Sequence, residues 1–176
     1  EYETIQANES MRTRARFKQI IDPSDFYLHQ RFMREDIPPL FELEFNKGIW
    51  EQGHVCPKVI DEQILLVTLN KRNHGKEHRY HDYFIDHQTF HWQSQNRSSP
   101  ANTSGQKIMN HVADGSEVHL FVRKHKMAGK KAAPFVYLGK VVYKNHTGAE
   151  PMNVVWNMEE PLSPDLQEEF IENTNS

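Results

Sequence analysis

The 176-residue chain is expected to fold as one α+β, mostly β domain, a small β-barrel with helical additions at its N-terminus. Two observations predict this class. From Ile64 onward, short runs rich in β-branched and aromatic residues are separated by turn residues, as in small all-β domains. Before Ile64 the patterns are helical or irregular. A chain of this length can bury a substantial core.

The N-terminal part of the chain predicts two helices. The first covers residues 10–21 and ends before Pro23, which cannot continue a helix. The second covers residues 24–35, with Ser24 as its N-cap and aromatic residues along one side. The dipeptide at 38–39, Pro-Pro, then breaks the chain before an irregular segment.

The remainder of the chain predicts strands with one helix between them. The expected strands cover residues 64–69, 80–86, 89–96, 117–123, 135–143 and 152–158. The last two strands are expected to pair across a turn that contains Gly148. A short helix is expected over residues 106–113, after a loop over 97–105 that is rich in Ser, Asn and Gly.

Three segments are expected along the chain. Residues 1–23 are a linker or helix from a preceding region, because the chain begins with Glu1 rather than Met. Residues 24–165 form the domain, and residues 166–176 form a polar tail. No apolar run approaches the roughly 20 residues of a membrane span, so no membrane partner is expected. The absence of a signal peptide and the single cysteine, Cys56, predict a cytoplasmic protein without disulfides.

The segment 80–96 is the most informative part of the sequence. Two alternating runs separated by His87-Gln88 predict a β-hairpin with a two-residue loop. In that register Tyr83 lies opposite Trp92, and Ile85 lies opposite Phe90. This face of the hairpin is expected to join the core.

The other face of the hairpin combines rings with hydrogen-bonding groups. Asp82 is expected opposite Gln93, and Tyr80 opposite Gln95. Aromatic rings beside amides and carboxylates can hold a planar polar ligand such as a nucleobase. The alternative is a half-buried sheet with a solvated polar face.

Charge is distributed unevenly along the chain, although the net charge is only −3. Residues 67–149 contain 13 Lys and Arg against 5 Asp and Glu, whereas residues 150–176 contain seven acidic residues and no Lys or Arg. This segregation predicts a polyanion-binding face in the middle of the chain. The alternative is that the charges spread around the fold and cancel locally.

Two basic clusters border the expected sheet. One contains Lys71 and Arg72, just before the hairpin, and the other contains Arg123, Lys124 and Lys126. Basic loops beside a sheet that carries aromatic residues combine phosphate attraction with ring stacking, as nucleic-acid-binding domains do. The alternative is that these loops simply keep the domain soluble.

Signatures of catalysis are absent from the sequence. The chain has no Gly-Lys-Ser/Thr phosphate loop, no Gly-x-Ser-x-Gly nucleophile motif and no His-Glu-x-x-His zinc motif. Cys56 is interpreted as a small buried residue rather than a nucleophile. We therefore expect no enzyme activity, no metal and no cofactor in this segment.

Six ordered motifs carry a resemblance to a known family. They are LVTLNK at 66–71, YHDY at 80–83, FHWQSQN at 90–96, LFVR at 120–123, PFVYLG at 134–139 and GxxPM at 148–152. Over about residues 25–165 the chain resembles the C-terminal domain of helicase-linked, modification-dependent (type IV) restriction enzymes of the SauUSI type. The resemblance implies a fold similar to SRA and PUA-like barrels. It also implies recognition of 5-methylcytosine or 5-hydroxymethylcytosine in double-stranded DNA.

Recognition of a modified cytosine is expected to proceed by flipping the base into an aromatic pocket. The residues expected to bind the base are Tyr80, Asp82, Tyr83, His91, Trp92, Gln93, Ser94 and Gln95. Among them Asp82 is expected to accept a hydrogen bond from cytosine N4, and Trp92 either stacks on the base or belongs to the core. The residues expected to contact DNA phosphates are Lys71, Arg72, Arg123, Lys124 and Lys126.

The resemblance also implies a larger parent protein. In that protein a phospholipase-D-like nuclease and a superfamily II helicase precede this domain in the same polypeptide, and residues 1–23 connect to the helicase. The parent is expected to be an ATP-dependent restriction endonuclease that uses ATP and Mg²⁺. Two alternatives for the domain stay open: a protein-interaction module that couples nuclease and helicase, and an RNA-binding PUA-like domain.

Overall fold

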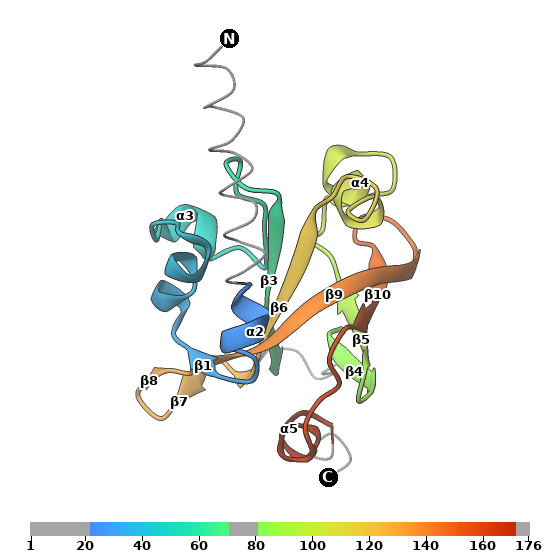
Figure 1. Ribbon diagram of the computed structural model, residues 1–176. Helices are drawn as coiled ribbons and strands as arrows, with labels where there is room; N and C mark the ends of the chain where they lie inside the picture. Colours follow the sequence, from blue (N-terminus) through green and yellow to red (C-terminus); the bar gives the residue numbers. More distant parts are fainter. Residues whose placement is uncertain (1–21, 71–80, 172–176) are drawn as a thin grey trace.

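The computed structural model describes residues 22–70 and 81–171 (Figure 1). The fold is α+β and mostly sheet, which confirms this part of the predicted fold class, whereas the β-barrel stays a prediction. The strands are β1 (Arg31–Phe32), β2 (His54–Val55), β3 (Glu62–Asn70), β4 (Tyr83–Asp86), β5 (Thr89–Gln93), β6 (Glu117–His125), β7 (Met127–Ala128), β8 (Lys131–Ala132), β9 (Phe135–Thr147) and β10 (Asn153–Met158). The helices are α2 (Pro23–Phe26), α3 (Lys47–Trp50), α4 (Thr103–Met109) and α5 (Pro164–Phe170), with 3-10 turns η1 (Arg34–Asp36) and η2 (Pro38–Phe41).

Eight of the strands form one sheet in the order β2-β3-β6-β9-β10-β5-β4, with β1 also paired to β9. The pair β3–β6 is parallel, and the other pairs of this sheet are antiparallel. Within the described residues no ladder joins β2 to β4, so the sheet is open along this path. The two short strands β7 and β8 make a separate ribbon.

The long strand β9 connects the two halves of the sheet (Figure 1). Its first half pairs with β6, and its second half pairs with β10. Gly139 lies within the half that pairs with β6, next to the register shift between His119 and Phe121, and has φ of +85°, a conformation that side chains with a Cβ rarely adopt. A Cβ at this position would also lie 2.9 Å from Leu28 Cδ1, which would have to move.

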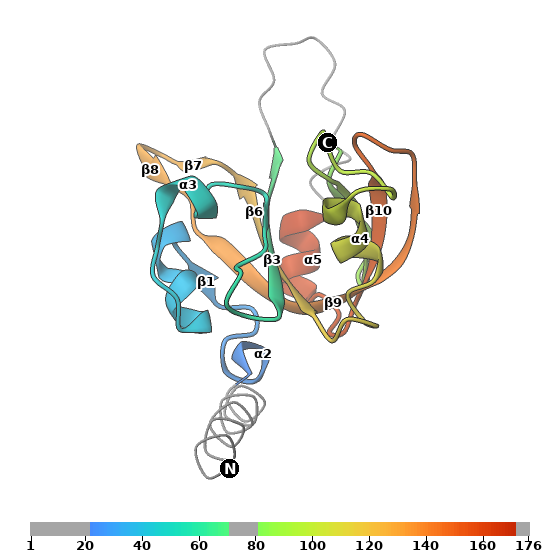
Figure 2. The same ribbon diagram turned by 90° about the horizontal axis from the view of Figure 1, so that it is seen from above.

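Both faces of the central strands are buried. One face, with the inner residues of β4, β5 and β10, packs against α4 and α5 in a large apolar cluster. The opposite face of β3, β6 and β9 packs against residues 27–60 in a second cluster. Figure 2 shows α4 and α5 on one side of β3 and β6, and α3 and β1 on the other side. No helix in the described ranges has both the length and the apolar character needed to cross a membrane.

The N-terminal segment differs from the expected helix over residues 24–35. Only α2 is helical; its N-cap is Asp22, whose carboxylate accepts the Ser24 N–H at 2.9 Å, so Ser24 is not the cap. The chain then leaves the helix because His29 N donates to Tyr137 O at 2.7 Å and β1 pairs with β9. Tertiary pairing therefore outweighs the local helical pattern.

The hairpin has the expected two-residue loop but a different register. Tyr83 pairs with His91 and Phe84 with Phe90, and Ile85 forms a bulge. The prediction that Tyr83 and Ile85 face the core is therefore wrong. Phe84 is buried instead, with its ring 4.7 Å from Phe90 and 5.7 Å from Phe170. The bulge changes the alternation of faces, which spacing alone does not reveal.

Other elements follow the prediction with shifted ends. The pairing of β9 and β10 across Gly148 is confirmed. Helix α4 begins three residues before the expected segment 106–113, because Asn102 caps it through a bond from Gly105 N. Helix α5 extends into the region expected to be a polar tail, and Leu166 and Phe170 pack into the core. Residues 166–170 thus pack within the domain rather than in a tail. The expected helix over 10–21 lies outside the described residues.

Candidate functional site

The parallel pairing of β3 and β6 places the end of β3 beside the basic cluster that contains Arg123, Lys124 and Lys126. Asn70, the last residue of β3, is the register partner of His125, and their side-chain nitrogens Nδ2 and Nδ1 lie 3.3 Å apart. The cluster of Lys71 and Arg72 follows Asn70 directly in the sequence, although these two residues lie outside the described part of the chain. The second cluster, around Lys124, therefore begins beside the end of β3.

Close to the end of β3, two arginines contact the same aromatic ring. The guanidinium carbon of Arg123 lies 4.3 Å from the centroid of Phe135, and that of Arg34 lies 5.1 Å from it. Arg123 comes from β6 and Arg34 from η1, so the two halves of the chain meet here. Cation–π contacts of this kind hold a guanidinium in a defined place.

Hydrogen bonds on one side of each guanidinium fix its orientation. Arg123 is only 6% exposed and donates from Nε to Thr68 Oγ1 at 2.9 Å and from Nη1 to Ala133 O at 3.1 Å. Arg34 donates from Nη1 to Trp50 O at 2.7 Å. Burial, together with the charge of Arg34, lowers the pKa of Arg123 to about 10. Burial also lowers the pKa of Arg34.

Both arginines line a cavity of about 600 Å³. The charged side chains around it are Arg34, Glu35, Lys47, Glu51, Arg123 and Lys126. Lys47 and Glu51 form an exposed ion pair with 4.0 Å between Nζ and Oε1. Within the described residues neither arginine has a carboxylate oxygen within 4.0 Å. The cavity therefore retains an excess of positive charge.

The hairpin places its aromatic and polar residues on two different surfaces. Tyr83 is 42% exposed and its ring stacks on that of His91, with centroids 4.5 Å apart and an angle of 13° between planes. His91 Nδ1 donates to His81 O at 2.8 Å. Asp82 is buried, and its Oδ1 accepts the Gln93 N–H at 2.9 Å. Tyr83 and His91 thus form an exposed stack beside a carboxylate held in place by the backbone.

Several residues expected to bind the base have structural roles. Trp92 is 3% exposed and packs against Trp156 and His54, so its ring belongs to the core and not to a stacking surface. Ser94 is buried, and its Oγ accepts the Met152 N–H at 2.8 Å.

The remaining predicted residues lie at or near the surface. Gln95 is exposed, and Gln93 is partly exposed with Nε2 3.4 Å from Asn153 Oδ1. Lys124 is partly exposed and Lys126 is exposed at the rim of the cationic cavity. Tyr80 lies outside the described residues.

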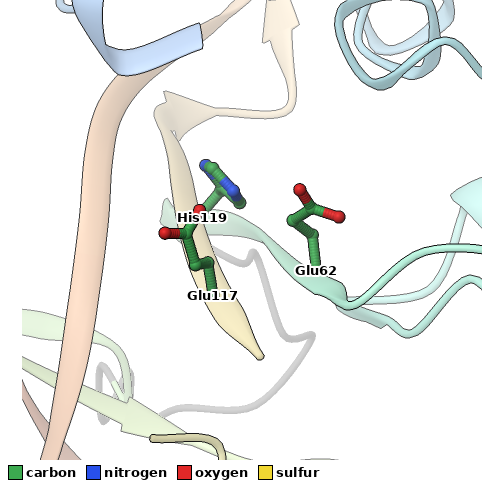
Figure 3. A group of neighbouring side chains, drawn as sticks. All are labelled: Glu62, Glu117 and His119. Atoms are coloured by element: carbon green, nitrogen blue, oxygen red, sulfur yellow. The ribbon is translucent and has the colours of Figure 1, made fainter. Parts of the chain in front are cut away.

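The opposite end of the same sheet face carries acidic groups. Glu62, Glu117 and His119 place one ligand atom each within 4.8 Å of one another (Figure 3). Two carboxylates and an imidazole are donors that suit a divalent transition metal, so these are the described residues that can hold a cation. They border a cavity of about 340 Å³. The sequence analysis did not select this group.

A lysine already supplies positive charge to this acidic end. Lys140 Nζ lies 2.5 Å from Asp22 Oδ2 and 3.4 Å from Glu117 Oε1. Burial alone would raise the pKa of Asp22, but hydrogen bonds from Lys140 and Ser24 hold the pKa below its usual value. Burial and the surrounding carboxylates raise the pKa of Tyr137, whose hydroxyl lies 2.7 Å from His119 Nδ1. Ion pairs and hydrogen bonds within the domain thus connect the polar side chains of the acidic end.

The cysteine does not form a nucleophilic pair with its neighbouring histidine. Cys56 Sγ lies 3.2 Å from His54 Nε2, but that nitrogen also lies 2.7 Å from Gln63 Oε1. The Gln63 amide is oriented because its Nε2 donates to Lys107 O at 2.8 Å. His54 Nε2 must therefore donate its proton to Gln63 and cannot act as a base toward Cys56. Burial also raises the pKa of Cys56.

Arg34 and the acidic group are the features that sequence reasoning missed. Arg34 falls in a segment that was expected to be helical, 89 positions before Arg123, and only the pairing of β1 with β9 brings it to the cavity. The alternation Glu117-x-His119 gave a signal within one strand. Its partner Glu62 is identified only by the parallel register, in which Glu62 pairs with Glu117.

Fold and site together define an α+β domain with an open mixed sheet, an exposed aromatic stack and a cationic cavity. A family model described as "Domain of unknown function (DUF3427)" matches residues 26–170, and the chain belongs to this family. The match begins at the end of α2 and ends with α5, so it spans the folded elements described above. No curated protein matches the chain.

Proposed function

We propose that this domain binds double-stranded DNA and recognises 5-methylcytosine or 5-hydroxymethylcytosine, as the specificity module of a modification-dependent restriction endonuclease. The observation that carries the DNA-binding proposal is the parallel β3–β6 pair, which places the end of β3 beside the basic cluster at residues 123–126, while Lys71 and Arg72 follow β3 in the sequence. Phosphate contacts of this kind supply most of the affinity of DNA-binding proteins. The curved sheet around α4 and α5 supports the further proposal of an SRA/PUA-like fold.

In the proposed complex the flipped base meets the polar end of the hairpin. The exposed stack of Tyr83 on His91 offers a ring face to a base, and stacking of this kind contributes about 1–3 kcal/mol. Asp82 lies next to Tyr83 in the chain, and its carboxylate can accept the exocyclic amine of cytosine, which thymine lacks. Opening of the hairpin end toward the ligand is required, because Asp82 is 5% exposed.

The parent protein is proposed to contain a helicase and a nuclease that use ATP and Mg²⁺, with this domain itself acting without a cofactor. In that arrangement the domain selects the DNA, and the chemistry takes place elsewhere in the polypeptide. A cytoplasmic location is consistent with this proposal.

The test compares fluorescence anisotropy of three duplexes that differ only in cytosine, 5-methylcytosine or 5-hydroxymethylcytosine. We expect at least tenfold tighter binding to one modified duplex, or about 1.4 kcal/mol. Asp82→Asn keeps an oxygen for the Gln93 N–H but removes the charge, and we expect it to lose the preference. Asp86→Asn is the matched control, because Asp86 is an exposed carboxylate at the other end of β4 that also accepts a backbone N–H.

Equal affinity of the wild-type domain for all three duplexes would exclude recognition of the modified base. A preference that survives Asp82→Asn would instead move the pocket away from the hairpin. Loss of preference in Asp82→Asn but not in Asp86→Asn is the expected result.

A further inference from the structure

The two arginines on Phe135 are arranged as a receptor for an anion. Each guanidinium is anchored by a backbone carbonyl on one side, through Ala133 O for Arg123 and Trp50 O for Arg34. The Nη2 groups make no hydrogen bond within the described residues, and no arginine nitrogen there is both buried and unpartnered. These N–H groups therefore reach the solvent of the cavity.

The two guanidinium groups repel each other, and Glu51 and Glu35 compensate the charge of Arg34 only from a distance. Arg34 and Arg123 are close enough that the charge of one lowers the pKa of the other. The acidic side chains Glu35 and Glu51 border the same cavity, but neither comes within 4.0 Å of a guanidinium nitrogen of Arg34 or Arg123. An anion that accepts hydrogen bonds from both guanidinium groups would offset their repulsion, and guanidinium groups match phosphate oxygens in geometry.

The surroundings of the cavity favour phosphate over a single small carboxylate. Lys126 lies at its rim, and the β7–β8 ribbon that carries Lys131 continues from it. Further cationic side chains are therefore available near the cavity for the neighbouring phosphates of a polymer. The volume of about 600 Å³ also accommodates a phosphate with its neighbouring sugar.

We propose that the cavity between Arg34 and Arg123 binds a phosphate group, and that the phosphate comes from the DNA backbone. The second half of this statement rests on the proposed function. Because a backbone phosphate is the same in modified and unmodified DNA, the site contributes affinity and register but no base preference.

The experiment measures DNA binding of the full 176-residue chain by anisotropy between about 50 and 200 mM salt. Arg34→Gln removes one guanidinium from the cavity, and Arg31→Gln is its matched control. Arg31 lies three positions away, carries the same charge and pairs with Glu169 at 2.7 Å on the surface. We expect Arg34→Gln to bind unmodified and methylated duplexes about tenfold more weakly, with a salt slope smaller by about 1. Arg31→Gln is expected to change affinity by about twofold or less.

Thermal melts show whether each variant is folded. If Arg34→Gln does not fold, Arg34→Lys takes its place, since it keeps the charge but lacks the planar fork, and a loss of about threefold is expected. A second arm compares the melting temperature in inorganic phosphate with that in chloride of equal ionic strength. If phosphate raises the melting temperature of the wild type but not that of the Arg34 variant, the site binds inorganic phosphate as well as DNA. Poly-glutamate serves as a non-phosphate polyanion.

The outcomes separate this site from base recognition. Equal losses on both duplexes support the phosphate site even if the wild type has no preference for a modified base, which would refute base recognition alone. If the Arg34 and Arg31 variants have the same DNA affinity and the same melting temperature in phosphate, the proposed phosphate site is wrong, whatever the base preference is. Poly-glutamate competing as well as DNA would also overturn it, because the cavity would then not select phosphate.

Discussion

The two ends of one sheet face differ in how their charges are compensated. At the acidic end, the carboxylates of Asp22 and Glu117 both contact Lys140. At the cationic end, Arg34 and Arg123 contact the ring of Phe135, and no carboxylate of the described residues lies within 4.0 Å of them. Both ends are built on β3, β6 and β9, so the same scaffold serves two purposes.

Pairing of charges within the domain identifies the acidic end as the structural one. A charge that is paired within the domain stabilises the fold, and its removal leaves a partner buried and unpaired. A charge held in place by carbonyls and a ring, without a carboxylate in direct contact, is available to the phosphate that we propose as its partner. Judged only by how close the charged groups lie to one another, the acidic group would be the better candidate for a ligand-binding site. Judged by which charges are paired within the domain, the cationic cavity is the better candidate.

The largest effect is expected from Lys140→Met at the acidic end. The side chains of Lys140 and Asp22 are only 19% and 12% exposed, so the variant leaves a largely buried carboxylate without its cation. We expect a loss of about 3 kcal/mol in the free energy of unfolding, measured by urea denaturation. The double variant with Asp22→Asn should recover at least half of this loss, because Asn still caps α2. A loss that the second substitution does not reduce would show that the ion pair is not its cause.

A much smaller effect on stability is expected from Arg123→Met at the cationic end. Methionine leaves no carboxylate unpaired, and only Thr68 Oγ1 and Ala133 O lose a hydrogen-bond donor, so the free energy of unfolding should fall by about 1 kcal/mol. DNA binding should nevertheless weaken about as much as in Arg34→Gln. A stability loss as large as that of Lys140→Met would mean that Arg123 is a structural residue and would remove the distinction between the two ends.

Local patterns in the sequence predicted the strands but not their partners. Alternation identified β6 and the turn at Gly148, and the two-residue gap identified the hairpin loop. The bulge at Ile85 was not predictable, because it follows from burial of Phe84 against Phe170 at the other end of the chain. The sequence also leaves two roles open for Trp92, because its burial depends on packing against His54 and Trp156.

In the candidate site, too, local patterns predicted single residues but not their spatial neighbours. Arg123 was selected because it lies in a basic cluster, which is a local property. Arg34 could not be selected, since its position depends on the β1–β9 pairing. The parallel register of β3 and β6, which places Asn70 beside His125, is likewise a long-range property of the fold.

Hydrogen–deuterium exchange with and without a 5-methylcytosine duplex distinguishes DNA binding at the cationic end and the hairpin from binding at the acidic end. Binding of DNA at the cationic end and the hairpin predicts slower exchange in residues 123–133 and 81–93, and unchanged exchange in residues 111–119 at the acidic end. Slower exchange confined to residues 111–119 and 62–64 would contradict the account, because the ligand would then occupy the acidic end of the sheet.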